Sequence, residues 1–297
     1  MSIGKGKQWV DNNKLISTDI TNWDNFKRSD FFYKIALWNP DTNGLRYLKF
    51  LLYNCGLNMN DKQFFILDKI DNRNIGNPYS VKINNRQLDF DYLQAVHEIY
   101  NIDSNMNLNK INSILEIGAG YGRTCHSMLC NYDNISEYNI LDLDEMIGHS
   151  KLYLKEVLDV KLYKKINFIS VDKLDEISNK KFDLAIQIDG FNEMDIQDVY
   201  FYLDYIDNHC NYFYTKNPVG KYFDKSLDNH WSGQSTVDNA LKSGILTDII
   251  DIDDNIIVEE NGNNKFISSF TPSNNWRCIY SGQSVPISFY WEALYEK

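Results

Sequence analysis

Residues 113–123 constrain the fold of this chain more than any other segment. The apolar run Ser-Ile-Leu-Glu-Ile is followed by Gly118, Gly120 and Gly122, and a segment with helical spacing begins at Arg123. This order indicates a strand, a tight glycine turn and the start of a helix. Because glycine has no Cβ, the backbone of such a turn can come close to a nucleotide-like ligand. The segment therefore predicts a ligand site as well as a local fold.

The glycine turn stands in a region where apolar strands alternate with helical segments. Such alternation is typical of the α/β class, in which a Rossmann-like parallel sheet carries helices on both faces. We expect antiparallel strands from the C-terminal region to complete one edge of this sheet. The expected parallel strands cover residues 111–117, 138–143, 166–171, 182–188 and 211–215, and the expected helices cover residues 123–129, 146–158 and 196–206.

The residues before the sheet lack this alternation and predict a mostly helical region. We therefore divide the chain into an N-terminal cap, residues 1–108, which would shape the substrate site, and a ligand-binding sheet domain, residues 109–297. Within the cap, the expected helices cover residues 31–38, 45–53, 62–70 and 88–102, and a short strand covers residues 80–83.

The residues after the last parallel strand predict a loop and further strands. Residues 218–235 are rich in Gly, Asn, Asp and Ser, and long loops of this kind often serve as lids or binding loops. The Asn261-Gly262 pair predicts a hairpin over residues 256–270, and residues 277–280 predict a short strand.

Charge and cysteine content exclude several classes of function. The formal net charge is −11, so a phosphate backbone would be repelled and we expect no nucleic-acid partner. Five cysteines without a CxxC pair form neither a disulfide framework nor a zinc site. No signal peptide opens the chain, and no apolar run approaches the ~20 residues that a membrane span requires. We therefore expect a cytoplasmic protein.

Acidic residues at the strand ends point to the kind of ligand. Glu116 precedes the glycine turn, and Asp142, Asp172 and Asp189 stand where later strands end, at the edge where open α/β sheets bind ligands. Asp142 is placed to accept hydrogen bonds from ribose hydroxyls, and Asp172 to face an adenine amino group. The turn lacks the last glycine of a dinucleotide fingerprint and the Lys-Ser/Thr of a phosphate loop.

A ring of carboxylates favours a cationic adenosine ligand without phosphates over NAD. The sequence therefore predicts S-adenosylmethionine as cofactor. The residues expected to bind it are Glu116, Gly118, Ala119, Gly120, Tyr121, Asp142, Leu143, Asp172 and Asp189.

Residues 116–123, Glu-Ile-Gly-Ala-Gly-Tyr-Gly-Arg, resemble the first motif of class I S-adenosylmethionine-dependent methyltransferases. More narrowly, the chain is similar to the sugar O-methyltransferases of bacterial surface-glycan gene clusters. Residues 142–145 resemble the Asp-Leu-Pro-Glu of that family, with Asp144 in place of proline. Residues 190–194 resemble its Ser-Phe-Gln-Glu-Met, from which Gly190 and Asn192 depart. Residues 214–217 resemble its fifth strand, which ends at asparagine.

The resemblance implies methyl transfer to a hydroxyl of a saccharide or nucleotide-sugar acceptor, with S-adenosylhomocysteine as product. A sugar hydroxyl holds its proton tightly, so a general base usually assists. Two candidates for this base are Glu193, just after the fourth strand, and His230, in the long loop beside Trp231. No metal ligand is assigned, and a homodimer is possible.

Two other functions stay open from the sequence alone. Asp142-Leu-Asp144 follows an apolar strand, as in metal-dependent glycosyltransferases that hold Mn²⁺ and a diphosphate, but that function leaves the glycine turn unexplained. A methyltransferase fold without activity, serving as a partner subunit, is the other; the intact glycines and acids argue against it.

Overall fold

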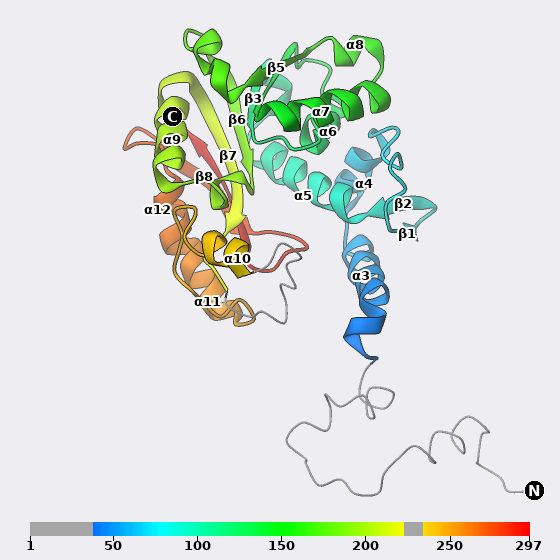
Figure 1. Cartoon of the computed structure of the whole chain (residues 1–297). Helices are drawn as coiled ribbons and strands as arrows, with labels where there is room; N and C mark the ends of the chain where they lie inside the picture. The colour runs from blue at the N-terminus through cyan, green and yellow to red at the C-terminus, as the bar shows by residue number, and fades with distance from the viewer. Residues whose placement is uncertain (1–37, 223–233) are drawn as a thin grey trace, which may run out of the picture. The chain divides into compact units, whose positions relative to one another are not determined.

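A seven-stranded sheet with helices on both faces organises the structure, a computed structural model that describes residues 38–222 and 234–297 (Figure 1). The strand order is β5-β4-β3-β6-β7-β9-β8; the first five strands in this order are parallel, and β9 is antiparallel to both β7 and β8. The chain divides into two units at residues 51 and 52, and the sheet lies in the second. The strands are β3 (Ser113–Ile117), β4 (Glu137–Asp142), β5 (Ile166–Ser170), β6 (Phe182–Ile188), β7 (Cys210–Pro218), β8 (Arg277–Gln283) and β9 (Tyr290–Glu296).

The predicted fold class is confirmed, because all five expected parallel strands form with helices between them. Figure 1 shows α5, α6 and α7 on one face of the sheet, and α9 with α11 and α12 on the other. Apolar side chains of the central strands are buried on both faces, as expected for a parallel sheet. The connecting helices are α6 (Arg123–Asn131), α7 (Asp144–Val157), α8 (Val160–Tyr163) and α9 (Ile196–His209), with short 3₁₀ segments η3 (Val171–Ile177) and η4 (Gly190–Asn192).

The described part of the N-terminal region is helical, as predicted, and contains one small hairpin. Asn60 and Gln63 form a reciprocal capping box at the start of α4, and the Asp89 side chain caps α5 by accepting from the Tyr92 N–H. The expected helix at residues 31–38 falls almost wholly outside the described residues, and the domain boundary at residue 108 stays a prediction. The elements are α3 (Pro40–Leu57), α4 (Asp61–Asp68), β1 (Ser80–Ile83), β2 (Arg86–Asp89), α5 (Phe90–Asn105) and η2 (Leu108–Lys110).

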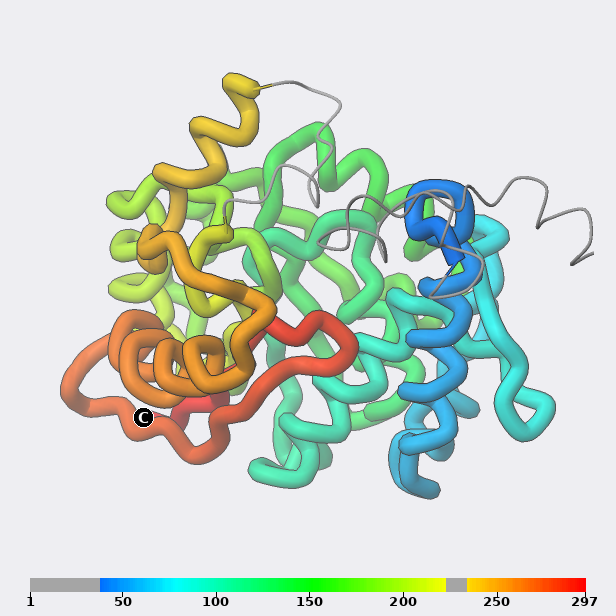
Figure 2. Tube along the Cα trace, turned by 90° about the horizontal axis from the view of Figure 1, so that it is seen from below, coloured from blue at the N-terminus to red at the C-terminus, as the bar shows by residue number. Residues whose placement is uncertain are grey.

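The hairpin predicted over residues 256–270 is wrong. This segment forms α11 (Asn255–Glu260), a π-helical turn η5 (Asn261–Phe266) and α12 (Ile267–Phe270), after the separate helix α10 (Gln234–Ala240). Figure 2 shows this orange segment beside the red C-terminal strands. Val258, Gly262, Phe266 and Phe270 recur at every fourth position and are all buried, so tertiary packing outweighs the turn preference of Asn-Gly.

Gly262→Ala should lower the free energy of unfolding by about 1–3 kcal/mol, the usual cost of overpacking. A Cβ at this position would lie 2.3 Å from Cδ2 of Trp291, which is buried on β9. Gly148→Ala in α7 is the matched control, because its Cβ would meet nothing within 4 Å. Urea unfolding of both variants checks this; equal stability of Gly262→Ala and Gly148→Ala would contradict the packing.

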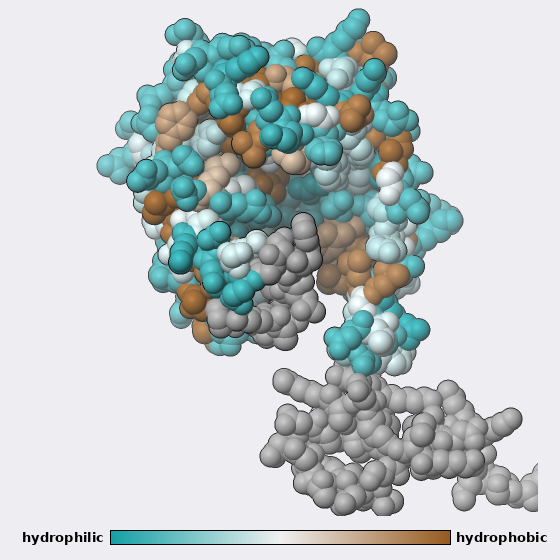
Figure 3. Space-filling model, viewed as in Figure 1, coloured by the Kyte–Doolittle hydropathy of each residue, from teal (hydrophilic) through white to brown (hydrophobic). Residues whose placement is uncertain are grey.

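Across residues 38–222 and 234–297, none of the helices is both long and apolar enough to cross a membrane. On the face seen in Figure 3, hydrophobic residues are scattered among hydrophilic ones.

Candidate active site

The glycine turn between β3 and α6 has open space beside its first two glycines and close packing at its third. Gly118, Gly120 and Gly122 all have positive φ, of 73°, 58° and 98°. A Cβ at Gly118 or Gly120 would meet nothing within 4 Å, whereas one at Gly122 would lie 2.7 Å from Cδ1 of Leu154 on α7. The first two glycines therefore leave room for a ligand, and the third allows close helix packing.

Asp142, at the end of β4, holds the glycine turn in place. Its Oδ2 accepts from the Gly120 N–H at 2.9 Å, and its Oδ1 accepts from the Leu143 N–H at 2.8 Å. Burial raises the pKa of Asp142, and these backbone donors oppose the rise. A carboxylate has about four acceptor sites, so it retains capacity for ribose hydroxyls. The structure thus joins Asp142 to the turn, and its role toward a cofactor stays a prediction.

The other residues predicted near the cofactor differ in exposure. Leu143, directly after Asp142, is 56% exposed at the same edge of the sheet, and Asp172 is exposed in the first turn of η3. Ala119 is partly exposed within the turn. The hydroxyl of Tyr121 donates to Asp91 Oδ2 at 3.1 Å. Open access makes Leu143, Asp172 and Ala119 available to a ligand.

Glu116 lies inside the protein rather than at the sheet edge. Its Oε2 accepts from the Tyr138 hydroxyl at 2.7 Å, and the residue is 3% exposed. Burial raises the pKa of this carboxyl to about 7, although Tyr138 and Arg123 oppose the rise. Its predicted contact with the cofactor stays a prediction, and the structure places it among protein groups.

Asp189 follows β6 with a backbone conformation that non-glycine residues rarely adopt. Its φ is 65°, its N–H donates to the Lys216 carbonyl at 2.8 Å, and its Oδ1 accepts from the Tyr290 hydroxyl at 2.7 Å. Left-handed residues of this kind cost free energy and cluster at functional sites. Contacts from β7 and β9 therefore fix the turn that leads into Glu193.

A cavity of about 910 Å³ opens beside this turn. It is lined by polar, charged and aromatic side chains, including Asn192, Glu193, Lys221, Tyr222, Phe289 and Tyr290. Burial and the nearby Asp189 raise the pKa of Glu193, and Lys221 lowers it. The predicted base Glu193 is thus part of this cavity wall, whereas His230 lies outside the described residues.

Lys221 is a cavity residue that the sequence did not single out. It is 6% exposed, and its amino group donates to the Asn192 carbonyl at 3.0 Å and to Asn192 Oδ1. Burial lowers the pKa of Lys221 to about 8, while Asp189 and Glu193 raise it. The partners come from segments 29 residues apart, so spacing alone gives no signal for the pair.

A buried charge network connects the glycine turn to α5 and β7. Arg123, at the start of α6, pairs with Glu98 on α5 at 3.0 Å, and Lys216 on β7 pairs with Glu98 at 2.8 Å. Lys216 also donates to Gln94 at 2.9 Å. Burial raises the pKa of Glu98, but the two cations outweigh it and hold that pKa below its ordinary value. Glu98 lies to one side of the most apolar face of this helix, so the sequence pattern carries no signal for its burial in this network.

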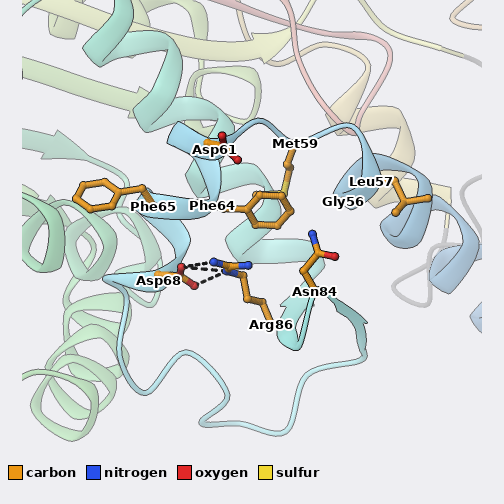
Figure 4. Close-up of a pocket in the computed structure, with 9 residues that line it drawn as sticks. All are labelled: Gly56, Leu57, Met59, Asp61, Phe64, Phe65, Asp68, Asn84 and Arg86. Carbon is orange, nitrogen blue, oxygen red and sulfur yellow. Dashed lines mark hydrogen bonds and ion pairs between the residues drawn. The ribbon is translucent and has the colours of Figure 1, made fainter.

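A second cavity, of about 420 Å³, lies between the end of α3, α4 and the β1–β2 hairpin (Figure 4). Figure 4 shows the Arg86 side chain directed at Asp68, with Nε–Oδ1 at 2.8 Å, near the ring of Phe64. None of the predicted site residues that the structure describes lines this second cavity.

In the part of the chain that the structure describes, no group of three or more His, Cys, Asp or Glu is placed to hold a metal ion. The Asp142 carboxylate accepts hydrogen bonds from backbone N–H groups, and Asp144 is exposed at the start of α7. This arrangement gives the Asp142-Leu-Asp144 segment no added support as a metal site.

No protein-family model and no curated protein sequence matches this chain. Among solved structures, mitomycin 7-O-methyltransferase MmcR aligns over 67% of this chain and 53% of its own, with 12% identity and a TM-score of 0.43. Human N-acetylserotonin methyltransferase in complex with SAM aligns over 70% and 56%, with 13% identity and a TM-score of 0.42. The alignment with MmcR therefore spans about half of that protein's length.

Proposed function

We propose that this chain is an S-adenosylmethionine-dependent O-methyltransferase. The observation that carries this proposal is the open glycine turn at the carboxyl end of β3, tied to Asp142 at the end of β4. From β3 the chain continues to β4 and β5 in one direction along the sheet, whereas from the neighbouring β6 it continues to β7 in the other. Open α/β sheets bind ligands at such a switch point. Because Gly118 and Gly120 have no Cβ, a cofactor has the space to contact the backbone of the turn.

Charge supports this cofactor over one that carries phosphates. The side chains available at the sheet edge include Asp142, Asp172 and Asp189, and Arg123, the first residue after the turn, is already paired with Glu98. Carboxylates attract a sulfonium and accept hydrogen bonds from ribose hydroxyls, but they repel a diphosphate. When bound, S-adenosylmethionine supplies an activated methyl group.

The cavity beside η4 is proposed to hold the acceptor, whose hydroxyl must lie about 3 Å from the methyl carbon. Asn192 and Ser243 offer polar contacts, and Tyr222 and Phe289 offer ring faces. Polar groups together with aromatic rings suit a saccharide or nucleotide sugar, in agreement with the sequence resemblance. Glu193 and His230 stay proposed proton acceptors.

The test combines binding with turnover. Calorimetry should detect S-adenosylhomocysteine binding to the full chain, and labelled methyl transfer should be screened over nucleotide sugars and glycan fragments, with and without chelator. Failure to bind S-adenosylhomocysteine would overturn the cofactor assignment. Binding with transfer only to acceptors other than sugars would overturn the substrate class alone.

Asp142→Ala should weaken S-adenosylhomocysteine binding by about 10- to 100-fold, because it removes hydrogen bonds to a charged group and releases the Gly120 N–H. Calorimetry at constant pH measures the change. Asp159→Ala is the control: Asp159 likewise caps a backbone N–H, that of Leu162 at 2.8 Å, but at an exposed helix start. Equal binding by both variants would remove Asp142 from the site.

A further inference from the structure

The backbone N–H and carbonyl of Lys221 are both hydrogen-bonded to one neighbouring segment, which fixes where its side chain begins. Its N–H donates to the Asp248 carbonyl at 2.8 Å, and its carbonyl accepts from the Ile250 N–H at 2.8 Å. The side chain then runs to Asn192 along the wall of the 910 Å³ cavity. Lys221 is therefore a buried amine in the wall of the proposed acceptor site.

The amino group of Lys221 has two acceptors, both on Asn192. Ser243 Oγ also donates to the Asn192 carbonyl at 2.9 Å, which keeps that carbonyl in place. A neutral amine has two N–H groups and one lone pair. When Asn192 takes both N–H groups, the lone pair occupies the remaining direction; in the ammonium form a third N–H occupies it.

The charged and titratable groups around Lys221 make both forms accessible near neutral pH. Asp189 and Glu193 face it from the η4 turn and favour the ammonium, and the Tyr290 hydroxyl donates to Asp189. The Asp248 carboxylate pairs instead with Lys265 at 2.6 Å, and Lys242 lines the cavity. Among the residues described, no carboxylate forms an ion pair with Lys221, so burial prevails and lowers its pKa to about 8.

We propose that Lys221, oriented by Asn192, accepts the proton of the acceptor hydroxyl during methyl transfer. This inference rests on the proposed function. The O–H bond breaks and its proton goes to Nζ of the neutral amine. The oxygen forms its bond to the methyl carbon as the carbon–sulfur bond breaks, and that electron pair stays on sulfur. The ammonium then returns its proton to water, so no further reactant is required.

An amine of this pKa suits the task better than a carboxylate. General bases work best when their pKa lies near the working pH, and buried lysines are tuned to 7–8 for this purpose. Glu193 is more than a third exposed, and although burial and Asp189 raise the pKa of its carboxyl, that rise starts from an ordinary value of about 4.3, against about 10.4 for a lysine. The geometry therefore assigns proton transfer to Lys221 and an electrostatic influence on its pKa to Glu193.

The first test measures the amine itself in the full chain, with no acceptor needed. In protein labelled with ¹³C at lysine Cε, the Lys221 signal, identified by its loss in Lys221→Arg, should titrate near pH 8, against about 10.4 for ordinary lysines. Glu193→Gln should move the midpoint lower, because it removes a charge that stabilises the ammonium. If Lys221 instead titrated at the same pH as the other lysines, the inference would be overturned, because such an amine is already protonated near neutral pH and has no lone pair to accept a proton.

The second test separates Lys221 from Glu193 by turnover. With an acceptor from the screen, Lys221→Arg should lower kcat by about 10²- to 10⁴-fold, the usual contribution of a general base. Its S-adenosylhomocysteine affinity should stay within about 2-fold, and Lys265→Arg, at an exposed pair, serves as matched control. Loss of turnover in Glu193→Gln but not in Lys221→Arg would return the role to Glu193. Wild-type protein that fails to bind S-adenosylhomocysteine would refute the proposed function, whatever the Lys221 midpoint.

Discussion

Glu98→Gln should lower the free energy of unfolding by about 3–5 kcal/mol, although it keeps the size of the side chain. Glu98 and Lys216 are each 1% exposed, so their charges are almost wholly removed from water. The substitution leaves Lys216 and Arg123 buried without the carboxylate that pairs with both. Because removing one partner leaves an uncompensated charge, the loss exceeds the value of an ordinary hydrogen bond.

A double-mutant cycle measures the coupling. Lys216→Met alone should also destabilise, whereas Glu98→Gln combined with Lys216→Met should cost less than the sum, because the second substitution removes a charge that the first left unpaired. Lys265→Gln breaks an exposed pair, with side chains 55% and 67% exposed, and should change stability by at most about 1 kcal/mol. Urea unfolding of all four variants gives the comparison. Additive effects at residues 98 and 216 would show that the network contributes no coupling.

Buried charges also show why one part of the fold could be predicted from the sequence and another part could not. Apolar runs that end at turn residues predicted β3 to β7 to within a few residues, because a strand buried on both faces is apolar almost throughout. The expected antiparallel strands at the C-terminal edge of the sheet are present, but β9, which lies between β7 and β8, was not assigned to residues 290–296 from the sequence. Its Glu292 is buried opposite Lys216 and accepts from the Tyr214 hydroxyl at 2.7 Å, so a charge interrupts the apolar pattern.

The candidate site likewise contains residues that the sequence predicts and residues that it does not. Gly118, Gly120 and Asp142 belong to a local pattern of turn and strand end, and the structure places them together. Lys221 meets Asn192 only because β6 and β7 are neighbours in the sheet. Such pairs depend on the three-dimensional arrangement, and no spacing in the sequence records them.

Gly120→Val should abolish S-adenosylhomocysteine binding while the chain remains folded. The open space at Gly120 is the space that the proposed cofactor needs, and valine fills it with two methyl groups. Valine at a φ of 58° also costs about 1–3 kcal/mol of backbone strain, so a weakened fold is a second route to reduced binding.

Gly76→Val separates strain from occupancy. Gly76 has a φ of 94°, and a Cβ there would likewise meet nothing within 4 Å, but this glycine lies in the turn before β1. Both variants should lose similar stability in urea, and only Gly120→Val should lose binding by calorimetry. Binding that survives in Gly120→Val would move the cofactor away from the turn. Binding lost equally in both variants would trace the effect to strain, and the turn would then serve the fold rather than the ligand.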